Sequence, residues 1–231
     1  GMDVLDLGCG WGSFSAWVLR HYPRCRVLAV SNSSTQAEFI RARYQPEALD
    51  RLEVVTADMN DFATDREFDR VVSVEMFEHM RNWARLFERV AGWLHPDGAF
   101  FQHVFCHQRF AYLYADEGAG DWMARYFFTG GIMPSQDLPQ HYGDHLEVVD
   151  QWRVSGLHYS MTLEAWLARM DRKREGLLPV FARTYGEDSE RWFARWRMFF
   201  MACSELFRYR GGDEWFVAHT LMRPRNTAAG I

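Results

Sequence analysis

The first hundred residues alternate short apolar runs with stretches in which apolar positions recur at helical spacing. The apolar runs have the length of buried strands, and the stretches between them have the length of helices. Alternation of this kind predicts an α/β fold with a mostly parallel, doubly wound sheet. The predicted strands are "MDVLDL", "RVLAV", "LEVVT", "FDRVVSV" and "GAFFQHVF", and the predicted helices are 13–21, 34–45 and 82–94.

The pattern changes after residue 107. Residues 108–146 form an aromatic stretch with Gly and Pro residues, which we interpret as a cap insertion over the sheet. Beyond it, "EVVDQWRVSG" and "EWFVAHTLMRP" have the pattern of strands, and "TLEAWLARM" and "DSERWFARWRMFFMACSELFRY" have that of helices. We therefore expect a core at 1–107, the cap insertion at 108–146, and the remaining core strands with substrate-binding helices at 147–231.

Composition and charge narrow the classes of partner. The chain has 231 residues, of which 48% are hydrophobic, and a formal net charge of -5. The apolar content is sufficient for a hydrophobic core, whereas the net negative charge gives no basic surface for nucleic acid. No stretch of the sequence has the ~18 uninterrupted apolar residues of a membrane span. The four cysteines are scattered without a CxxC pair, which favours reduced thiols and a cytoplasmic location. We interpret the histidines outside the candidate site as solvated or hydrogen-bonded groups, so we expect no metal.

A glycine-rich turn follows the first predicted strand. It reads "VLDLGCGWGSF", with Asp6 followed by Gly8, Gly10 and Gly12. Such a turn lets the backbone approach a ligand at the carboxyl edge of the sheet. The GxGxG spacing, and Ser31 instead of a carboxylate after the second strand, disfavour a nicotinamide cofactor. The turn suits a nucleoside with a positively charged tail that Asp6 neutralises or orients, and a tight turn without a ligand is the other interpretation.

An apolar run that ends in charged groups marks a second candidate site. In "VVSVEMFEHM" the strand is followed by Glu75, Glu78 and His79. Buried carboxylates are costly without a partner or a task. We interpret the three residues as catalytic groups at the sheet edge, and a cluster that binds backbone amides at a helix terminus is the alternative.

Five stretches, in order along the chain, resemble one enzyme family. They are "DLGCGWG", "VSNSSTQ", "SVEMFEHM", "YFFTGGIMPS" and "HYSMTLEAWL". They resemble the S-adenosylmethionine-dependent methyltransferases related to cyclopropane fatty-acid synthases, and are most similar to the coclaurine-type N-methyltransferases of alkaloid synthesis. Family members have a long helical segment before the glycine turn, whereas this sequence enters its first strand within a few residues. We expect any site residue from such a segment to be absent.

The resemblance implies a Rossmann-like class I methyltransferase fold with a helical cap, S-adenosylmethionine as methyl donor and S-adenosylhomocysteine as product. Carried over residue by residue, the cofactor contacts are Gly8, Gly10 and Gly12 at the methionine end, Ser31 and Gln36 at the ribose, and Asp58, Met59 and Asn60 at the adenine. It further implies that Glu78 and His79 bind the ammonium form of an amine and take up its proton, with Glu75 as a positioning group or cofactor contact.

A second chemistry uses overlapping residues. In the cyclopropane synthases, the residues that match Glu78, His103 and Tyr159 hold a bicarbonate that removes a proton from a carbocation, and this sequence has all three. A further cysteine of those enzymes comes from the upstream segment. The sequence therefore leaves open whether a bicarbonate site is complete.

Two aromatic stretches favour the amine-methylating branch. "DWMARYFFTGGIMPS" and "WRMFF" resemble that branch, and Phe128, Trp196 and Phe199 would stack on a flat acceptor or attract its nitrogen. Aromatic residues at helical spacing are equally compatible with an ordinary core. We expect N-methylation of a small aromatic or cyclic amine, with methylene transfer to an unsaturated lipid as the alternative. The carboxylates of Glu75 and Glu78 disfavour a third interpretation, a binding module without catalytic activity. A homodimer is possible.

Overall fold

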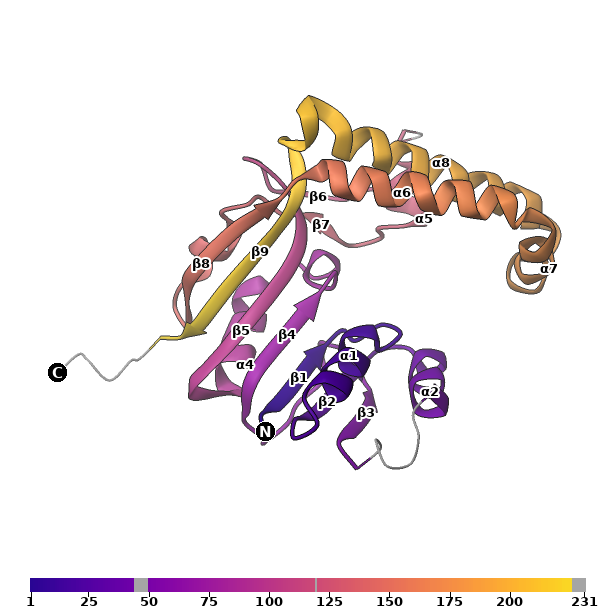
Figure 1. Cartoon of the computed structure of the whole chain (residues 1–231). Coiled ribbons are helices and arrows are strands. Elements are labelled where there is room, and N and C mark those ends of the chain that lie inside the picture. The colour runs from indigo at the N-terminus through magenta and orange to yellow at the C-terminus, as the bar shows by residue number, and fades with distance from the viewer. Residues whose placement is uncertain (44–49, 119, 226–231) are drawn as a thin grey trace.

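One seven-stranded sheet organises the computed structural model, which describes residues 1–43, 50–118 and 120–225 (Figure 1). The spatial order is β3-β2-β1-β4-β5-β9-β8, with β1 to β5 parallel and β9 antiparallel to both of its neighbours. The strands are β1 Asp3–Leu7, β2 Arg26–Ser31, β3 Leu52–Thr56, β4 Phe68–Val74, β5 Leu94–His107, β8 Leu146–Val154 and β9 Trp215–Pro224.

Helices cover both faces of the sheet. On β2, Val27 and Ala29 face α1 (Ser13–His21) and α2 (Ser34–Arg43), whereas Leu28 and Val30 belong to the core cluster beneath α4 (Trp83–Gly92). Successive strand residues point to opposite faces, so the apolar run has both faces to fill. The mostly parallel, doubly wound sheet predicted from the sequence is confirmed. The last two residues of the predicted helix 34–45 lie outside the described residues.

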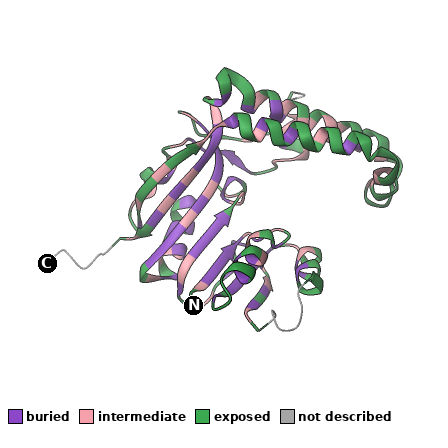
Figure 2. Ribbon diagram, viewed as in Figure 1, coloured by how far each residue is buried: buried purple, intermediate pink, exposed green. Residues whose placement is uncertain are grey.

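Three longer helices, which follow the predicted cap insertion in the sequence, lie at one end of the sheet, and we call them the cap. They are α6 Gly156–Arg172, α7 Arg174–Tyr185 and α8 Ser189–Arg208, and Figure 1 shows them extending sideways beyond the strands. The base of the cap is fixed by a cluster in which Leu163 and Phe207 pack against Phe105 and Val217 of the sheet. Farther out the helices are largely exposed, and α7 buries no residue (Figure 2).

The segment between β5 and β8 has little regular structure. It contains β6 Tyr112–Leu113, α5 Trp122–Tyr126, β7 Ile132–Met133 and the short 3-10 helix η2 Leu138–Tyr142. Further 3-10 turns are η1 Phe77–His79, η3 Gly186–Asp188 and η4 Tyr209–Gly212. Across the described ranges, every helix is too short or too polar to cross a membrane.

Candidate active site

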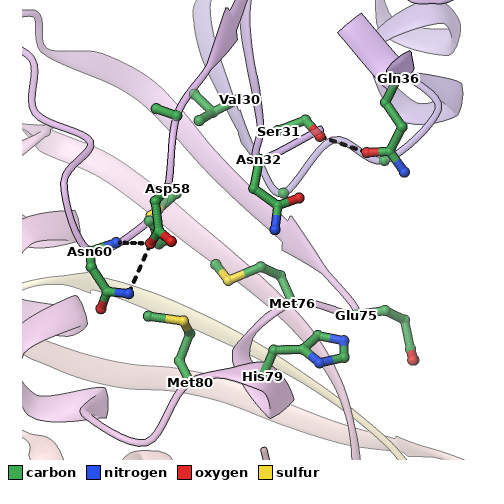
Figure 3. Close-up of a pocket in the computed structure, with 14 residues that line it drawn as sticks. Val30, Ser31, Asn32, Gln36, Asp58, Asn60, Glu75, Met76, His79 and Met80 are labelled. Atoms are coloured by element: carbon green, nitrogen blue, oxygen red, sulfur yellow. Dashed lines mark hydrogen bonds between the residues drawn. The ribbon is translucent and has the colours of Figure 1, made fainter. Parts of the chain in front are cut away.

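A cavity of about 480 Å³ lies where β1, β2, β3 and β4 end (Figure 3). This is the edge at which open α/β sheets bind ligands, and the volume suits a small molecule. Its walls include most of the residues predicted for the cofactor: Gly8, Gly10, Ser31, Gln36, Asp58, Met59 and Asn60. Glu75 and His79 line it as well. Five further lining residues were not predicted from the sequence, although each adjoins a predicted position: Val30, Asn32, Ala57, Met76 and Met80.

The glycine turn combines open and crowded positions. Gly8, Gly10 and Gly12 all have positive φ, at 86°, 52° and 75°. A Cβ on Gly10, which lines the cavity, would have no heavy atom within 4 Å, whereas a Cβ on Gly12 would lie 2.8 Å from Ile40 Cγ1 of α2. Gly10 therefore leaves room for a ligand, and Gly12, which does not line the cavity, permits close packing of helix on loop.

Asp6 lies beneath the glycine turn and does not line the cavity. Its carboxylate is buried and accepts a 2.6 Å hydrogen bond from Ser15 Oγ of α1. Burial raises the pKa of Asp6 to about 6. The hydrogen bond thus holds Asp6 against the start of α1 and not at the cavity, where it was predicted to neutralise or orient the cofactor.

The cavity walls carry pairs of polar groups that already contact each other. Ser31 Oγ donates to Gln36 Oε1 at 2.6 Å, and Asp58 Oδ1 accepts from both the backbone and the side-chain nitrogen of Asn60 at 2.8 Å (Figure 3). Arg89 of α4 donates to the carbonyl oxygen of Met59 at 2.6 Å. These contacts hold the loops after β2 and β3 in place.

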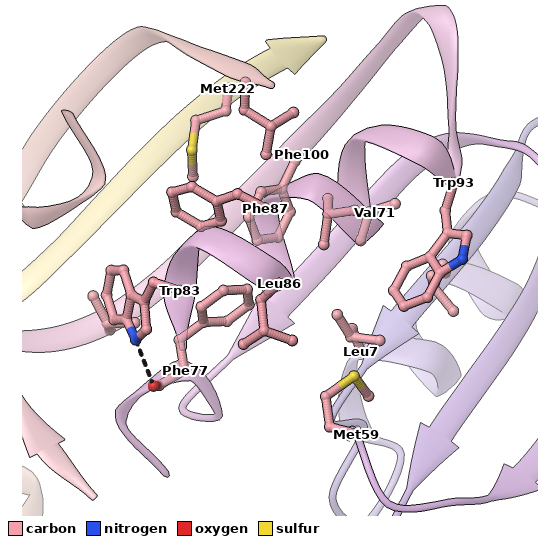
Figure 4. Close-up of a cluster of buried hydrophobic side chains, with 14 of the residues drawn as sticks. Leu7, Met59, Val71, Phe77, Trp83, Leu86, Phe87, Trp93, Phe100 and Met222 are labelled. Atoms are coloured by element: carbon pink, nitrogen blue, oxygen red, sulfur yellow. Dashed lines mark hydrogen bonds between the residues drawn. The ribbon is translucent and has the colours of Figure 1, made fainter. Parts of the chain in front are cut away.

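The loop that carries Glu75, Glu78 and His79 is anchored by aromatic packing. Phe77 is fully buried, and its ring lies 5.4 Å from that of Trp83 and 5.5 Å from that of Phe100. Trp83 Nε1 also donates to the Phe77 carbonyl oxygen at 3.0 Å (Figure 4). The buried ring therefore fixes the polar residues on either side of it.

Glu75 has an unusual backbone and a fully engaged side chain. It has a positive φ of 54°, a conformation that non-glycine residues seldom adopt and that often marks functional sites. Its Oε1 lies 2.8 Å from His103 Nε2 of β5, and its Oε2 accepts a 3.0 Å hydrogen bond from the hydroxyl of Tyr159 on α6. Burial and the nearby Glu75 charge raise the pKa of Tyr159, so its hydroxyl keeps the proton that it donates.

The contacts extend from Glu75 to a residue that was not predicted from the sequence. His103 Nδ1 lies 3.0 Å from Nε2 of His219 on β9. No motif marks His219, and its signal in the sequence is a histidine directly after the apolar run of a predicted strand. Tyr159, Glu75, His103 and His219 thus form one continuous array, which we call the Glu75 array.

Glu78 is completely buried and does not line the cavity. Its Oε1 accepts a 3.0 Å hydrogen bond from the backbone nitrogen of Phe105, and its Oε2 has no hydrogen-bond partner among the described residues. Burial, followed by the charge of Glu75, raises the pKa of Glu78 well above its ordinary value. A carboxyl group in this state holds a proton more firmly than an exposed one.

The three aromatic residues predicted for the acceptor form a row of ring contacts, in which Phe199 lies 5.7 Å from Phe128 and 5.8 Å from Trp196. Phe128 lies beside the site, with its ring 6.3 Å from that of His79 and 4.9 Å from that of Tyr114. Phe199 stacks on Phe127 at 4.2 Å. Trp196 lies farther along the cap, where it lines a separate groove between α6, α7 and α8.

Comparison with known proteins identifies the family. Residues 1–215 match the mycolic acid cyclopropane synthetase family. The chain belongs to this family. The resemblance to cyclopropane synthases and their relatives, predicted from the sequence, is thereby confirmed.

Individual relatives include both branches of chemistry. The chain is 36% identical to (S)-coclaurine N-methyltransferase of Thalictrum flavum subsp. glaucum, over 97% of its own length and 64% of that enzyme's length. It is 31% identical to cyclopropane-fatty-acyl-phospholipid synthase of Escherichia coli (strain K12), over 94% of its own length and 53% of the synthase. A crystal structure of coclaurine N-methyltransferase bound to N-methylheliamine and SAH superimposes with a TM-score of 0.90, over 96% of this chain and 65% of that one. This chain thus spans about two thirds of the N-methyltransferases that it resembles.

Proposed function

We propose that the protein is an S-adenosylmethionine-dependent N-methyltransferase that acts on a small aromatic or cyclic amine. The observation that carries this proposal is the engagement of Glu75. His103 Nε2 and the Tyr159 hydroxyl, which the cyclopropane chemistry would use to hold bicarbonate, both contact the carboxylate of Glu75 instead. A fixed internal negative charge disfavours a bound anion and favours a cationic acceptor.

The cavity beside Glu75 is the proposed cofactor site. The open side of Gly10 and the polar pairs of Ser31 with Gln36 and Asp58 with Asn60 fit a nucleoside with an amino-acid tail. The relative whose structure contains SAH supports the same choice. When bound, S-adenosylmethionine supplies an electrophilic methyl group on a sulfonium.

The chain's own residues prepare the acceptor nitrogen. In neutral solution an amine is mostly protonated, as an ammonium ion. It must lose this proton before its nitrogen can attack the methyl group. Glu75 attracts and orients the ammonium, and Glu78, whose pKa is raised by burial and by Glu75, takes up its proton. His79, on the cavity wall beside Phe128, contacts the acceptor. Apo geometry is often looser than that of the substrate complex, so the buried position of Glu78 is compatible with this role.

Methylene transfer to an unsaturated lipid is the second candidate. It is favoured by the presence of Glu78, His103 and Tyr159 close to Glu75 and by the similarity to the bacterial synthase. The two chemistries differ in one requirement, because only the second needs a bound anion to remove a proton from a carbocation.

The test is incubation of the protein with methyl-labelled S-adenosylmethionine and either a panel of cyclic amines or vesicles of unsaturated phospholipid. We expect label in amines at a rate that does not change when bicarbonate is removed by degassing. His103→Ala should then lower the rate less than Glu78→Gln does. Label found only in lipid, with a rate restored by bicarbonate, would reject the amine proposal.

We further propose a cytoplasmic location and a small-molecule amine as the partner. The possible homodimer stays a prediction.

A further inference from the structure

We propose that His219 is a positioning residue, which fixes the ring of His103 and thereby holds the carboxylate of Glu75 at the edge of the cavity. The consequence for methyl transfer rests on the function proposed above, whereas the contact itself does not. His219 lies outside the cavity lining and does not contact Glu75 directly. Its effect therefore has to pass through His103.

The sheet places the two histidines opposite each other. His103 on β5 and His219 on β9 form a directly paired position of the antiparallel ladder, so their side chains lie on the same face. The ring of His219 is held from two sides, because Phe101 lies 5.1 Å away and Trp152 lies 5.4 Å away, both at steep interplanar angles. The Nε2 atom of His219 is thus fixed at 3.0 Å from His103 Nδ1.

The positions of the protons on the two histidines follow from which of the neighbouring atoms can only accept a hydrogen bond. An ionised carboxylate can only accept, so His103 must donate from Nε2 to Glu75 Oε1. In neutral His103, Nδ1 is then an acceptor, and the hydrogen bond to it must come from Nε2–H of His219. A histidine tautomer is set by the hydrogen bond that its other nitrogen makes. His219 therefore favours the one tautomer of His103 that can hold Glu75.

The charges around His219 support the same arrangement. Burial and the neighbouring His103 lower the pKa of His219, so this ring stays neutral at and above neutral pH. Phe101 and Trp152, which pack against it, do not titrate. His103 is the titratable group that faces His219, and behind His103 lies Glu75, whose other oxygen is held by Tyr159.

The test compares two variants that each keep one property of His219. His219→Phe keeps the ring between Phe101 and Trp152 but has no nitrogen, and His219→Gln loses the ring but can place an amide N–H near the position of Nε2. The protein is labelled with ¹⁵N-histidine and studied by NMR at pH 8, with the signals of His103 assigned from their loss in His103→Gln. Binding of S-adenosylhomocysteine and the kinetics of amine methylation are measured on the same samples.

In the parent protein we expect His103 protonated at Nε2, with Nδ1 shifted by an accepted hydrogen bond. In His219→Phe that shift should disappear and kcat should fall about tenfold, as for loss of one hydrogen bond at the site, with KM and S-adenosylhomocysteine affinity nearly unchanged. His219→Gln should recover most of kcat. An unchanged His103 signal and kcat in His219→Phe would overturn the proposal, and so would equal losses in two variants that are both folded. If the parent methylates no amine, the proposed function fails, while the NMR comparison still decides whether His219 donates to His103.

Discussion

Tyr159 and Glu75, 84 positions apart in the sequence, are joined by a 3.0 Å hydrogen bond from the tyrosine hydroxyl to Oε2 of the carboxylate. Tyr159 lies in the first turns of α6, at the base of the cap, and Glu75 lies on the loop after β4 that lines the cavity. The cap and the proposed cofactor site therefore meet at one carboxylate. This is where we expect the acceptor nitrogen.

Replacement of Glu75 by Gly should convert the site from cation-binding to anion-binding. Glycine adopts the positive φ of 54° without strain, and its lack of a side chain frees His103 Nε2 and the Tyr159 hydroxyl for an external anion. We expect amine methylation to be lost and partly restored by added formate. In the matched variant Glu75→Gln the space stays filled, so formate should have no effect. A formate response that is equal in both variants, measured as initial rate, would contradict this account.

Glu78→Gln tests proton uptake. Because burial and Glu75 raise the pKa of Glu78, the parent rate should rise with pH as this group ionises, and the variant should lack that rise. Only the ionisation of the amine itself then remains, at higher pH, and kcat near neutrality should fall on the order of a hundredfold. The measurement is kcat against pH. An unchanged profile would remove Glu78 from the mechanism.

Gly10→Val should abolish binding of S-adenosylhomocysteine. Gly10 has a φ of 52° and open space beside it, so the new side chain would occupy the cavity. Gly211→Val is the control, because Gly211 has a φ of 73°, also has open space beside it, and lies outside the cavity. Both variants carry the backbone strain, and calorimetry should find ligand binding only in the control. Binding that is lost in both would point to strain and not to occlusion.

Two of the aromatic residues predicted for the acceptor should differ in their effect on it. Phe128 lies beside His79, whereas Trp196 lines the groove between α6, α7 and α8 and donates a 3.3 Å hydrogen bond to Tyr185. Phe128→Ala should raise KM for the amine about tenfold, and Trp196→Ala should lower the melting temperature with little change in KM. Steady-state kinetics and thermal melts of both variants check this. A raised KM in Trp196→Ala alone would move the acceptor site outward along the cap.

Asp6 should make the protein less stable as the pH rises. Its folded-state pKa, about 6, is raised above the ordinary value of 3.8, so the native state binds this proton more tightly than the unfolded state does. The resulting stability is complete below about pH 4 and is lost as the pH passes through 6. Asp6→Asn still accepts from Ser15 and cannot ionise, so it should exceed the parent at pH 7.5 by up to about 3 kcal/mol, at about 1.4 kcal/mol per pKa unit.

Chemical denaturation at pH 4 and pH 7.5 measures the Asp6 effect. Asp3→Asn is the matched control, because Arg26 lowers the pKa of Asp3 and this ion pair is largely exposed. That variant should change stability little at either pH. A parent whose stability is the same at both pH values relative to Asp6→Asn would show that Asp6 is not buried as described.

Local patterns predicted the core well because each strand there has two faces to bury. The run around Val27 and Leu28 packs on opposite helices, and the predicted helix 13–21 coincides with α1. The helix α7 was not predicted, since it buries no residue and contains Pro179, so it has no apolar face to reveal it. Its position between α6 and α8 follows from chain connection and not from an amphipathic pattern.

The candidate site shows where sequence reasoning stops. The resemblance named His103 and Tyr159, but it did not reveal that Glu75 engages both of them. Nor could spacing show that Asp6 and Gly12 lie outside the cavity lining, because this depends on the packing of the turn against α1 and α2. His219 was missed because only the strand order places β9 next to β5.

The place of β9 has a consequence for biosynthesis. This strand inserts between β5 and β8, both of which leave the ribosome earlier, and it brings together His103 and His219, which are 116 positions apart. Until it arrives, β5 and β8 each present an open edge that can pair with another chain, and pairing over such long separations is slow. The contacts around Glu75 are therefore complete only after β9 has been synthesised and has paired, so a nascent chain that stalls before this step is exposed to aggregation and lacks an organised active site.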